Sequence, residues 1–205
     1  MNPFDLNEVQ LDAIREISNI GMGHAATALS RLLGTRVDMS VPSVHRMKLS
    51  SVHDFVGGAE QPVAGVMLSM SGDASGLLML MFPLKCALQL VATLTNSTRD
   101  VHLPLSSLEA SAIGETGNIL ASAYLNAIGA LLKLTLLPSP PALSFDMAGA
   151  VLDPLLSRQC AIGDTSLLVR VEFHTSAPEV TGQFFMIPDP DSMGIMLRAA
   201  GIVHA

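Results

Sequence analysis

The sequence is poor in the residues that mark secreted, zinc-binding or nucleic-acid-binding proteins. Its 205 residues include only two cysteines, Cys86 and Cys160, which are too few and too far apart for a disulfide framework or a zinc site. Lysine and arginine number 11 against 18 acidic residues, and the net charge of −7 gives no basic surface for nucleic acid. No lysine or arginine precedes Arg15, so the basic start of a secretory signal is missing. These features predict a cytoplasmic protein that does not bind nucleic acid.

Long uninterrupted apolar runs are also missing, although the mean hydropathy is +0.47. The two candidate membrane spans are residues 76–94 and 119–137. Pro83 and Lys85 interrupt the first, and Lys133 interrupts the second. We therefore expect both segments to be buried in a core, with no membrane insertion.

What the sequence does contain is a repeated polar pattern. Two segments 99 positions apart each hold a short oxygen-bearing residue, a glutamate four positions later and an asparagine three beyond that: Asp12, Glu16 and Asn19, then Ser111, Glu115 and Asn118. Positions i, i+4, i+7 and i+11 share one face of a helix, so Gly23 extends the first polar stripe and Ser122 the second. The spacing predicts two helices whose carboxylate and amide face water or a partner.

Apolar residues lie on the opposite side of each predicted helix, as in helices that pack on a core. They are Leu11, Ile14, Ile17, Ala25, Ala28, Leu29 and Leu32 in the first, and Ile113, Leu120, Tyr124, Ala127, Ile128 and Leu131 in the second. Gly21 and Gly117 fall on these apolar sides. Because glycine costs about 1 kcal/mol relative to alanine inside a helix, both positions indicate close backbone packing, which we expect to be against a sheet.

The predicted helix starts repeat at the same offset. Asn7 followed by Gln10, and Ser106 followed by Glu109, are each typical of a capping box at a helix N-terminus. Gly34 is the expected C-cap of the first helix, whereas a lysine stands at the matching position of the second.

The remaining segments alternate between strand and helix patterns. Strands are predicted at 36–41, 44–49, 63–70, 77–82, 134–137, 166–174 and 182–187, shorter helices at 84–95 and 191–200, a loop at 50–61 and a connector at 96–104. Residues 145–157 are ambiguous, with a helix slightly favoured despite Pro154. The expected fold class is α+β. We predict a single domain over 1–205 made of two repeats, about 1–98 and 99–205, whose strands share one largely antiparallel sheet flanked by helices related by a pseudo-twofold axis.

The doubled motif resembles that of a known family. The pattern D/S-x-x-x-E-x-x-N, present twice, together with the run from Ile20 to Ser30 and the pair Val41 and Pro42, is similar to the CheC/CheX/FliY family of chemotaxis phosphatases, most closely to its CheC branch. Three positions depart from the family's pattern: His24 replaces a common Asn, Thr116 an aliphatic residue, and Ser111 an acid.

The resemblance implies a phosphatase that acts on the aspartyl phosphate of a CheY-type response regulator. Glu16 and Asn19 would form one catalytic site, and Glu115 and Asn118 a second, each entering the active site of the receiver domain. In each site the asparagine would orient the attacking water and the glutamate would pair with the receiver's lysine. Supporting roles in docking are expected for Asp12, Ser111, Gly23 and Ser122.

The resemblance also specifies partners and cofactors. The scissile acyl phosphate and a divalent metal, Mg²⁺, would belong to the receiver, so the chain itself is expected to need no cofactor. A CheD-type deamidase is left open as a second partner. None of the six histidines has the spacing of a metal-ligand pair.

Two alternative functions remain. A non-catalytic chemotaxis or flagellar-switch adaptor of the same fold would bind a receiver or a deamidase without hydrolysis. A membrane-surface protein is supported only by the mean hydropathy. A single exposed glutamate would be an ordinary solvated residue; the repetition of the whole pattern favours a functional surface.

Overall fold

A computed structural model of the chain describes residues 6–97, 101–153, 165–176 and 179–202. Its centre is one eight-stranded sheet in which every strand pair is antiparallel. The strands are β1 (Val37–Met39), β2 (Ser43–Lys48), β3 (Pro62–Gly72), β4 (Gly76–Pro83), β5 (Leu136–Pro138), β6 (Ala142–Met147), β7 (Thr165–Ser176) and β8 (Glu179–Pro188). Their order is β1-β7-β8-β4-β3-β5, with β2 also paired to β7 and β6 to β3. The α+β class and the antiparallel sheet are as predicted.

The elements recur at the offset found in the sequence. The helices α1 (Glu8–Leu33) and α3 (Ser107–Leu132) are both 26 residues long and begin 99 positions apart. The strands β1 and β5, and likewise β2 and β6, are separated by the same interval. The first two strands of each repeat pair with a strand of the other repeat: β1 and β2 pair with β7, and β5 and β6 pair with β3. The two halves therefore build the sheet jointly.

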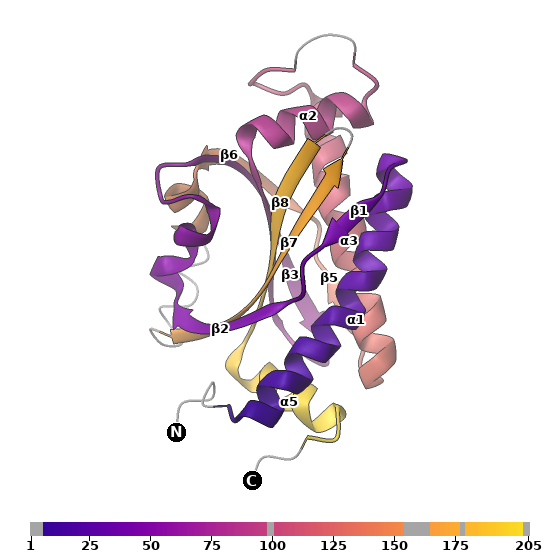
Figure 1. Cartoon of the computed structure of the whole chain (residues 1–205), viewed down its shortest axis with the longest axis vertical. Helices are drawn as coiled ribbons and strands as arrows, with labels where there is room; N and C mark the ends of the chain where they lie inside the picture. The colour runs from indigo at the N-terminus through magenta and orange to yellow at the C-terminus, as the bar shows by residue number, and fades with distance from the viewer. Residues whose placement is uncertain (1–5, 98–100, 154–164, 177–178, 203–205) are drawn as a thin grey trace.

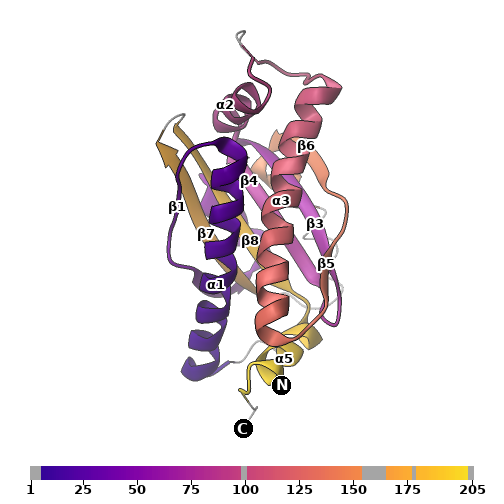
Figure 2. The same cartoon turned by 90° about the vertical axis from the view of Figure 1, so that its right-hand side faces the viewer.

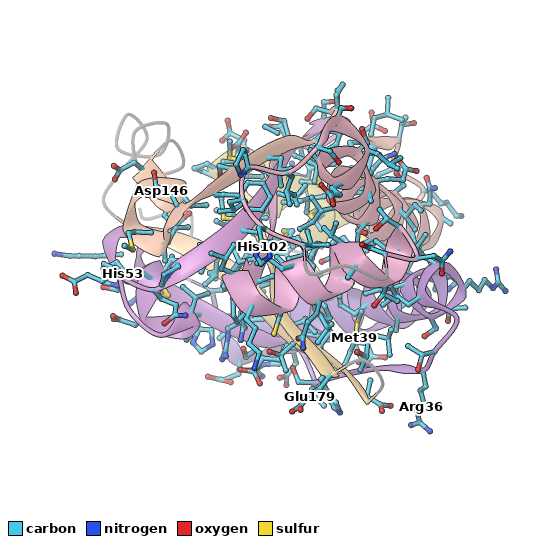
Figure 3. All side chains as sticks on the ribbon, turned by 90° about the horizontal axis from the view of Figure 1, so that it is seen from above. Arg36, Met39, His53, His102, Asp146 and Glu179 are labelled. Carbon is cyan, nitrogen blue, oxygen red and sulfur yellow. The ribbon has the colours of Figure 1, made fainter. Side chains whose placement is uncertain are left out.

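The sheet separates two hydrophobic cores. On one face lie α1 and α3, with α2 (Leu84–Leu94) and α5 (Pro190–Ala199) near the two ends of this helix pair (Figures 1 and 2). Strand β4 is buried on both faces: Leu78 and Leu80 belong to the core under the helices, and Met79 and Met81 to the other. That second core is covered by η1 (Leu49–Val56) and by the helical residues 148–153. Seen from above, His53 of η1 and Asp146 of β6 lie opposite Arg36, which follows α1 (Figure 3).

Both motif helices begin with the predicted capping boxes. The Asn7 side chain accepts from the Gln10 backbone N–H at 3.0 Å, and the Gln10 side chain accepts from the Asn7 N–H at 2.9 Å. In α3 the Ser106 N–H donates to Glu109 Oε2 at 2.8 Å. Both helices also end in a left-handed residue, Gly34 in α1 and a lysine in α3, so the matched position keeps its conformation without glycine.

The two buried glycines make different contacts. A Cβ on Gly117 would lie 2.5 Å from Val66 of β3, which confirms close packing of α3 on the sheet. A Cβ on Gly21 would lie 2.7 Å from the ring of Tyr124, so this glycine packs against α3 and the expected sheet contact is wrong. The large Tyr124 side chain occupies the space between the helices, and its hydroxyl donates to Ser18 Oγ at 3.4 Å.

Two local expectations are corrected, and a third is confirmed only in part. The predicted loop at 50–61 contains the 3-10 helix η1, because Val52 is fully buried in the second core. In the ambiguous segment 145–157, residues up to Met147 form β6 and residues 148–153 are helical, while 154–157 lie outside the described residues. Leu131 is 45% exposed; Leu132 takes the core position instead because it lies four residues after the buried Ile128. Cys160 also lies outside the described residues.

Candidate functional site

The two polar stripes lie on the outer face of a pair of antiparallel helices. Figure 2 shows α1 and α3 running side by side in opposite directions across the sheet. On the first stripe Asp12, Glu16, Asn19 and Gly23 are all exposed. On the second stripe Ser111 and Glu115 are exposed, whereas Asn118 and Ser122 are partly buried. Neither Glu–Asn pair is turned toward the core.

The contacts of Gly21 fix the separation of the two pairs. Gly21 lies against Tyr124 and Ile128. Because the helices are antiparallel, Asn118 is level with a point on α1 that lies about eight to twelve residues beyond Asn19. At a rise of 1.5 Å per residue, the axial distance between the two asparagines is about 12 to 18 Å. The pairs are thus separate sites on one surface, and the helices do not bring them into one active centre.

The two pairs differ in internal bonding. Asn118 Nδ2 donates to Glu115 Oε2 at 3.2 Å. No side-chain hydrogen bond joins Glu16 to Asn19, both of which are among the described residues. Asp12 of the first stripe instead forms an ion pair with Arg15, one turn further along α1. The second pair is therefore joined by a hydrogen bond that holds the amide, and the first pair has no such bond.

A groove of about 820 Å³ follows the seam between α1 and α3. It contains Asn19 and Gly23 from the predicted site, while Asn118 and Ser122 lie outside its lining. No atom lies within 4 Å of a Cβ placed on Gly23, so the groove is open at this position. The other polar or charged lining residues are His24, Thr27, Arg31 and Asn126.

Sequence reasoning missed the charged part of this groove. Asn19, Gly23, Thr27 and Arg31 follow one another at four-residue spacing along α1. This spacing was a visible signal that the stripe continues as far as Arg31. The second stripe continues in the same way, because Asn126 follows Asn118 and Ser122 at four-residue spacing and lies 99 positions after Thr27. That Asn126 faces the same groove as Asn19 follows only from the packing of α3 beside α1.

The chemistry of the stripes is that of binding and positioning. Each carboxylate can accept hydrogen bonds from a cation, and each amide can donate and accept at once, as is needed to hold a water molecule. Within the described residues there is no group of three or more His, Cys, Asp or Glu side chains that could hold a metal ion. Among the helices that the structure describes, none is long and apolar enough to cross a membrane.

The fold and the site together define a class: proteins with a duplicated α+β fold and a Glu–Asn pair on the outer face of each of two antiparallel helices. Comparison with known proteins specifies the family. The model of the CheC-like family matches residues 9–46 and 108–145, two segments that are themselves 99 positions apart. The CheY-P phosphatase CheC of Bacillus subtilis is 37% identical to this chain over 200 residues, which cover 96% of each protein. The chain belongs to the CheC-like family, as the doubled motif indicated.

Solved structures share the fold at lower sequence identity. FliY of Thermotoga maritima superposes with a TM-score of 0.73 at 23% identity, covering 98% of this chain and all of that chain. A chain of the CheX–CheY–BeF3–Mg²⁺ complex from Borrelia burgdorferi gives a TM-score of 0.57 at 18% identity, covering 86% of this chain and 98% of that chain. At these identities the similarity establishes the architecture.

Proposed function

We propose that the protein hydrolyses the aspartyl phosphate of a CheY-type response regulator, and so acts in two-component signalling during chemotaxis. The observation that carries the proposal is the exposure of Glu16, Asn19 and Glu115, with Asn118 partly buried, on two helix faces. A relative named as a CheY-P phosphatase is 37% identical over nearly the whole chain and supports the assignment of the substrate.

In the proposed mechanism each pair enters the receiver's active site in turn. The glutamate pairs with the receiver's lysine and fixes the orientation of the complex. The asparagine accepts a hydrogen bond from a water molecule and directs its oxygen at phosphorus, in line with the bond to the aspartyl oxygen. Hydrolysis by this route needs no nucleophile on this chain, because phosphoryl transfer chiefly requires positioning and electrostatic stabilisation.

The metal in this mechanism belongs to the receiver. A similar fold occurs in a complex that includes CheY, BeF3 and Mg²⁺, which supports a receiver-bound Mg²⁺ in the complex proposed here. The stripes offer one carboxylate per pair near the expected pocket, which suits a contact with the lysine better than a metal site of their own.

The decisive experiment follows the loss of phosphate from a phosphorylated CheY-type receiver. The Asn19→Ala, Asn118→Ala double variant should fold normally but no longer accelerate hydrolysis. Ser144→Ala, which removes an exposed hydroxyl from β6, is the matched control and should retain full activity. Full activity of the double asparagine variant would overturn the proposed roles.

The same assay distinguishes the adaptor function. An adaptor would bind the receiver without shortening the lifetime of its phosphate, so binding must be measured beside hydrolysis. A CheD-type deamidase remains a predicted second partner. A binding titration with the purified deamidase, followed by the phosphatase assay in its presence, tests that prediction.

A further inference from the structure

Two exposed apolar side chains occupy matching positions in the first turns of α1 and α3. Val9 is 64% exposed and Leu108 is 68% exposed, and they lie 99 positions apart. The large hydrophobic side chains that are exposed in the described structure are Val9, Val41, Leu103, Leu108, Leu131, Leu137 and Met147. Among them, only Val9 and Leu108 are related by the repeat. Isolated exposed hydrophobics are normal, but a matched pair in two repeats indicates a shared role.

Both side chains lie on the motif face of their helix. Val9 precedes Glu16 by seven residues, and Leu108 precedes Glu115 by seven. Seven residues make about two turns, so each apolar residue lies on the same face as its glutamate, about 10 Å away along the helix axis. Each polar stripe therefore has an apolar side chain at its outer end.

Neither residue contributes to the core of this chain. The core positions of the same helices are taken by residues such as Ile14 and Ile113, which are 3% and 0% exposed. An exposed valine is also a poorer helix former than alanine. The fold thus gains little from Val9 or from Leu108, and their apolar surface is available to another molecule.

We infer that Val9 and Leu108 are apolar anchors that dock the phosphorylated receiver domain beside the Glu–Asn pair on the same helix. The inference rests on the proposed function, and its occupant is the receiver because the anchors continue the face that carries the reactive pair. An anchor about 10 Å from the glutamate contacts the rim of the phosphorylation pocket and not the pocket itself. Such a contact binds substrate and transition state equally, so it affects KM and leaves kcat nearly unchanged.

The test isolates each site and then removes its anchor. In the Asn118→Ala background only the first pair is active, and Val9→Ser should raise KM for the phosphorylated receiver about tenfold with little change in kcat. In the Asn19→Ala background only the second pair is active, and Leu108→Ser should act in the same way. Val9→Ser should raise KM more than Leu108→Ser does in the Asn118→Ala background, and less than Leu108→Ser does in the Asn19→Ala background. A general loss of stability would not reverse this order.

The matched control is Val41→Ser, which removes a valine that is still more exposed, at 78%, and is located between β1 and β2. It should change KM by less than about twofold in either background, since its apolar surface is off both stripes. The anchor role is overturned if Val9→Ser and Leu108→Ser change KM no more than this control does. Normal hydrolysis by the unsubstituted protein would in that case leave the proposed function intact.

If the unsubstituted protein fails to accelerate hydrolysis, its affinity for the receiver activated by beryllofluoride and Mg²⁺ is measured in place of KM. Weaker binding of the Val9→Ser, Leu108→Ser variant then supports the anchors, and equal binding overturns them.

Discussion

The side chain of Asn118 is held by Glu115, one turn earlier in α3, through a 3.2 Å hydrogen bond from Nδ2 to Oε2. The equivalent Asn19 and Glu16 on α1 are not joined, although both pairs have the same spacing and lie on the same kind of helix face. The carboxylate of Glu115 thus has two tasks in the proposed mechanism: it orients the amide and it meets the receiver's lysine. The two tasks can be separated by substitution.

The first prediction separates orientation from charge at the second pair. In the Asn19→Ala background, Glu115→Ala removes both and should lower kcat/KM about tenfold or more, since a hydrogen bond to a charged group contributes about 1.5–3 kcal/mol. Glu115→Gln keeps an oxygen that can accept from Asn118 but removes the charge, so its loss should be smaller. Initial rates of phosphate release measure both. Equal rates for the two variants would show that holding the amide is unimportant.

A second prediction concerns packing between the motif helices. Gly21→Ala places a methyl group 2.7 Å from the Tyr124 ring and should lower the free energy of unfolding by about 1–3 kcal/mol. Gly23→Ala, two residues away in the same helix, meets open space and should instead gain up to about 1 kcal/mol from helix propensity. Urea unfolding of both variants provides the measurement. A stable Gly21→Ala protein would mean that α1 and α3 are further apart than described.

A third prediction tests the cap of α3. Ser106 Oγ accepts from the Glu109 N–H at 3.4 Å, and the Ser106 N–H donates to Glu109 Oε2 at 2.8 Å. Replacing Ser106 by alanine removes the side-chain half of the box and should cost about 0.5–2 kcal/mol of stability. Ser107→Ala, one residue further along and exposed, serves as the control in thermal unfolding. The assignment of the cap fails if the two variants unfold alike.

The fourth prediction is a pH dependence that arises at His45. Burial, and then the nearby positive charge of Arg170, lower the pKa of His45 below its ordinary value of 6.5. The unfolded chain therefore binds a proton at this residue more readily than the folded one. The contribution of neutral His45 to stability is fully present above the pKa that this residue has in the unfolded chain. It is lost as the pH falls from there through the lowered pKa of the folded state.

His45→Gln should remove this part of the acid sensitivity. The midpoint of urea unfolding, followed from neutral pH to about pH 5, should fall less steeply for the variant than for the unsubstituted protein. His24→Gln, which makes the same replacement at an exposed histidine of α1, is the matched control. Parallel curves for all three proteins would contradict the assignment.

Much of the fold was predictable because it depends on local signals that occur twice. The caps at Asn7 and Ser106, and the motif spacing of the two long helices, are short-range patterns, and the structure has them at the predicted residues. The hairpin of β3 and β4 was predictable for the same reason, since two apolar runs flank a segment of turn residues. The solvent exposure of Glu16 and Glu115 followed from helix periodicity alone.

The remaining features depend on contacts between distant segments. The sequence around Val52 is typical of a polar loop. It forms the 3-10 helix η1 because Val52 packs into the second core, which is built by residues far away in the sequence. The contact of Gly21 with Tyr124 requires knowing that α3 lies beside α1, and the inclusion of Asn126 in the groove depends on the same packing. A periodic pattern predicts which side of a helix is buried, but it does not predict what that side meets.

The exchange of strands between the halves has a consequence for synthesis on the ribosome. When the first half has emerged, β1 and β2 still lack β7, whose residue Thr175 pairs with Val37, 138 positions earlier. The new chain must therefore keep β1 and β2 without their partner strand until residues 165–176 have been made. Contacts of such long sequence separation favour slow folding.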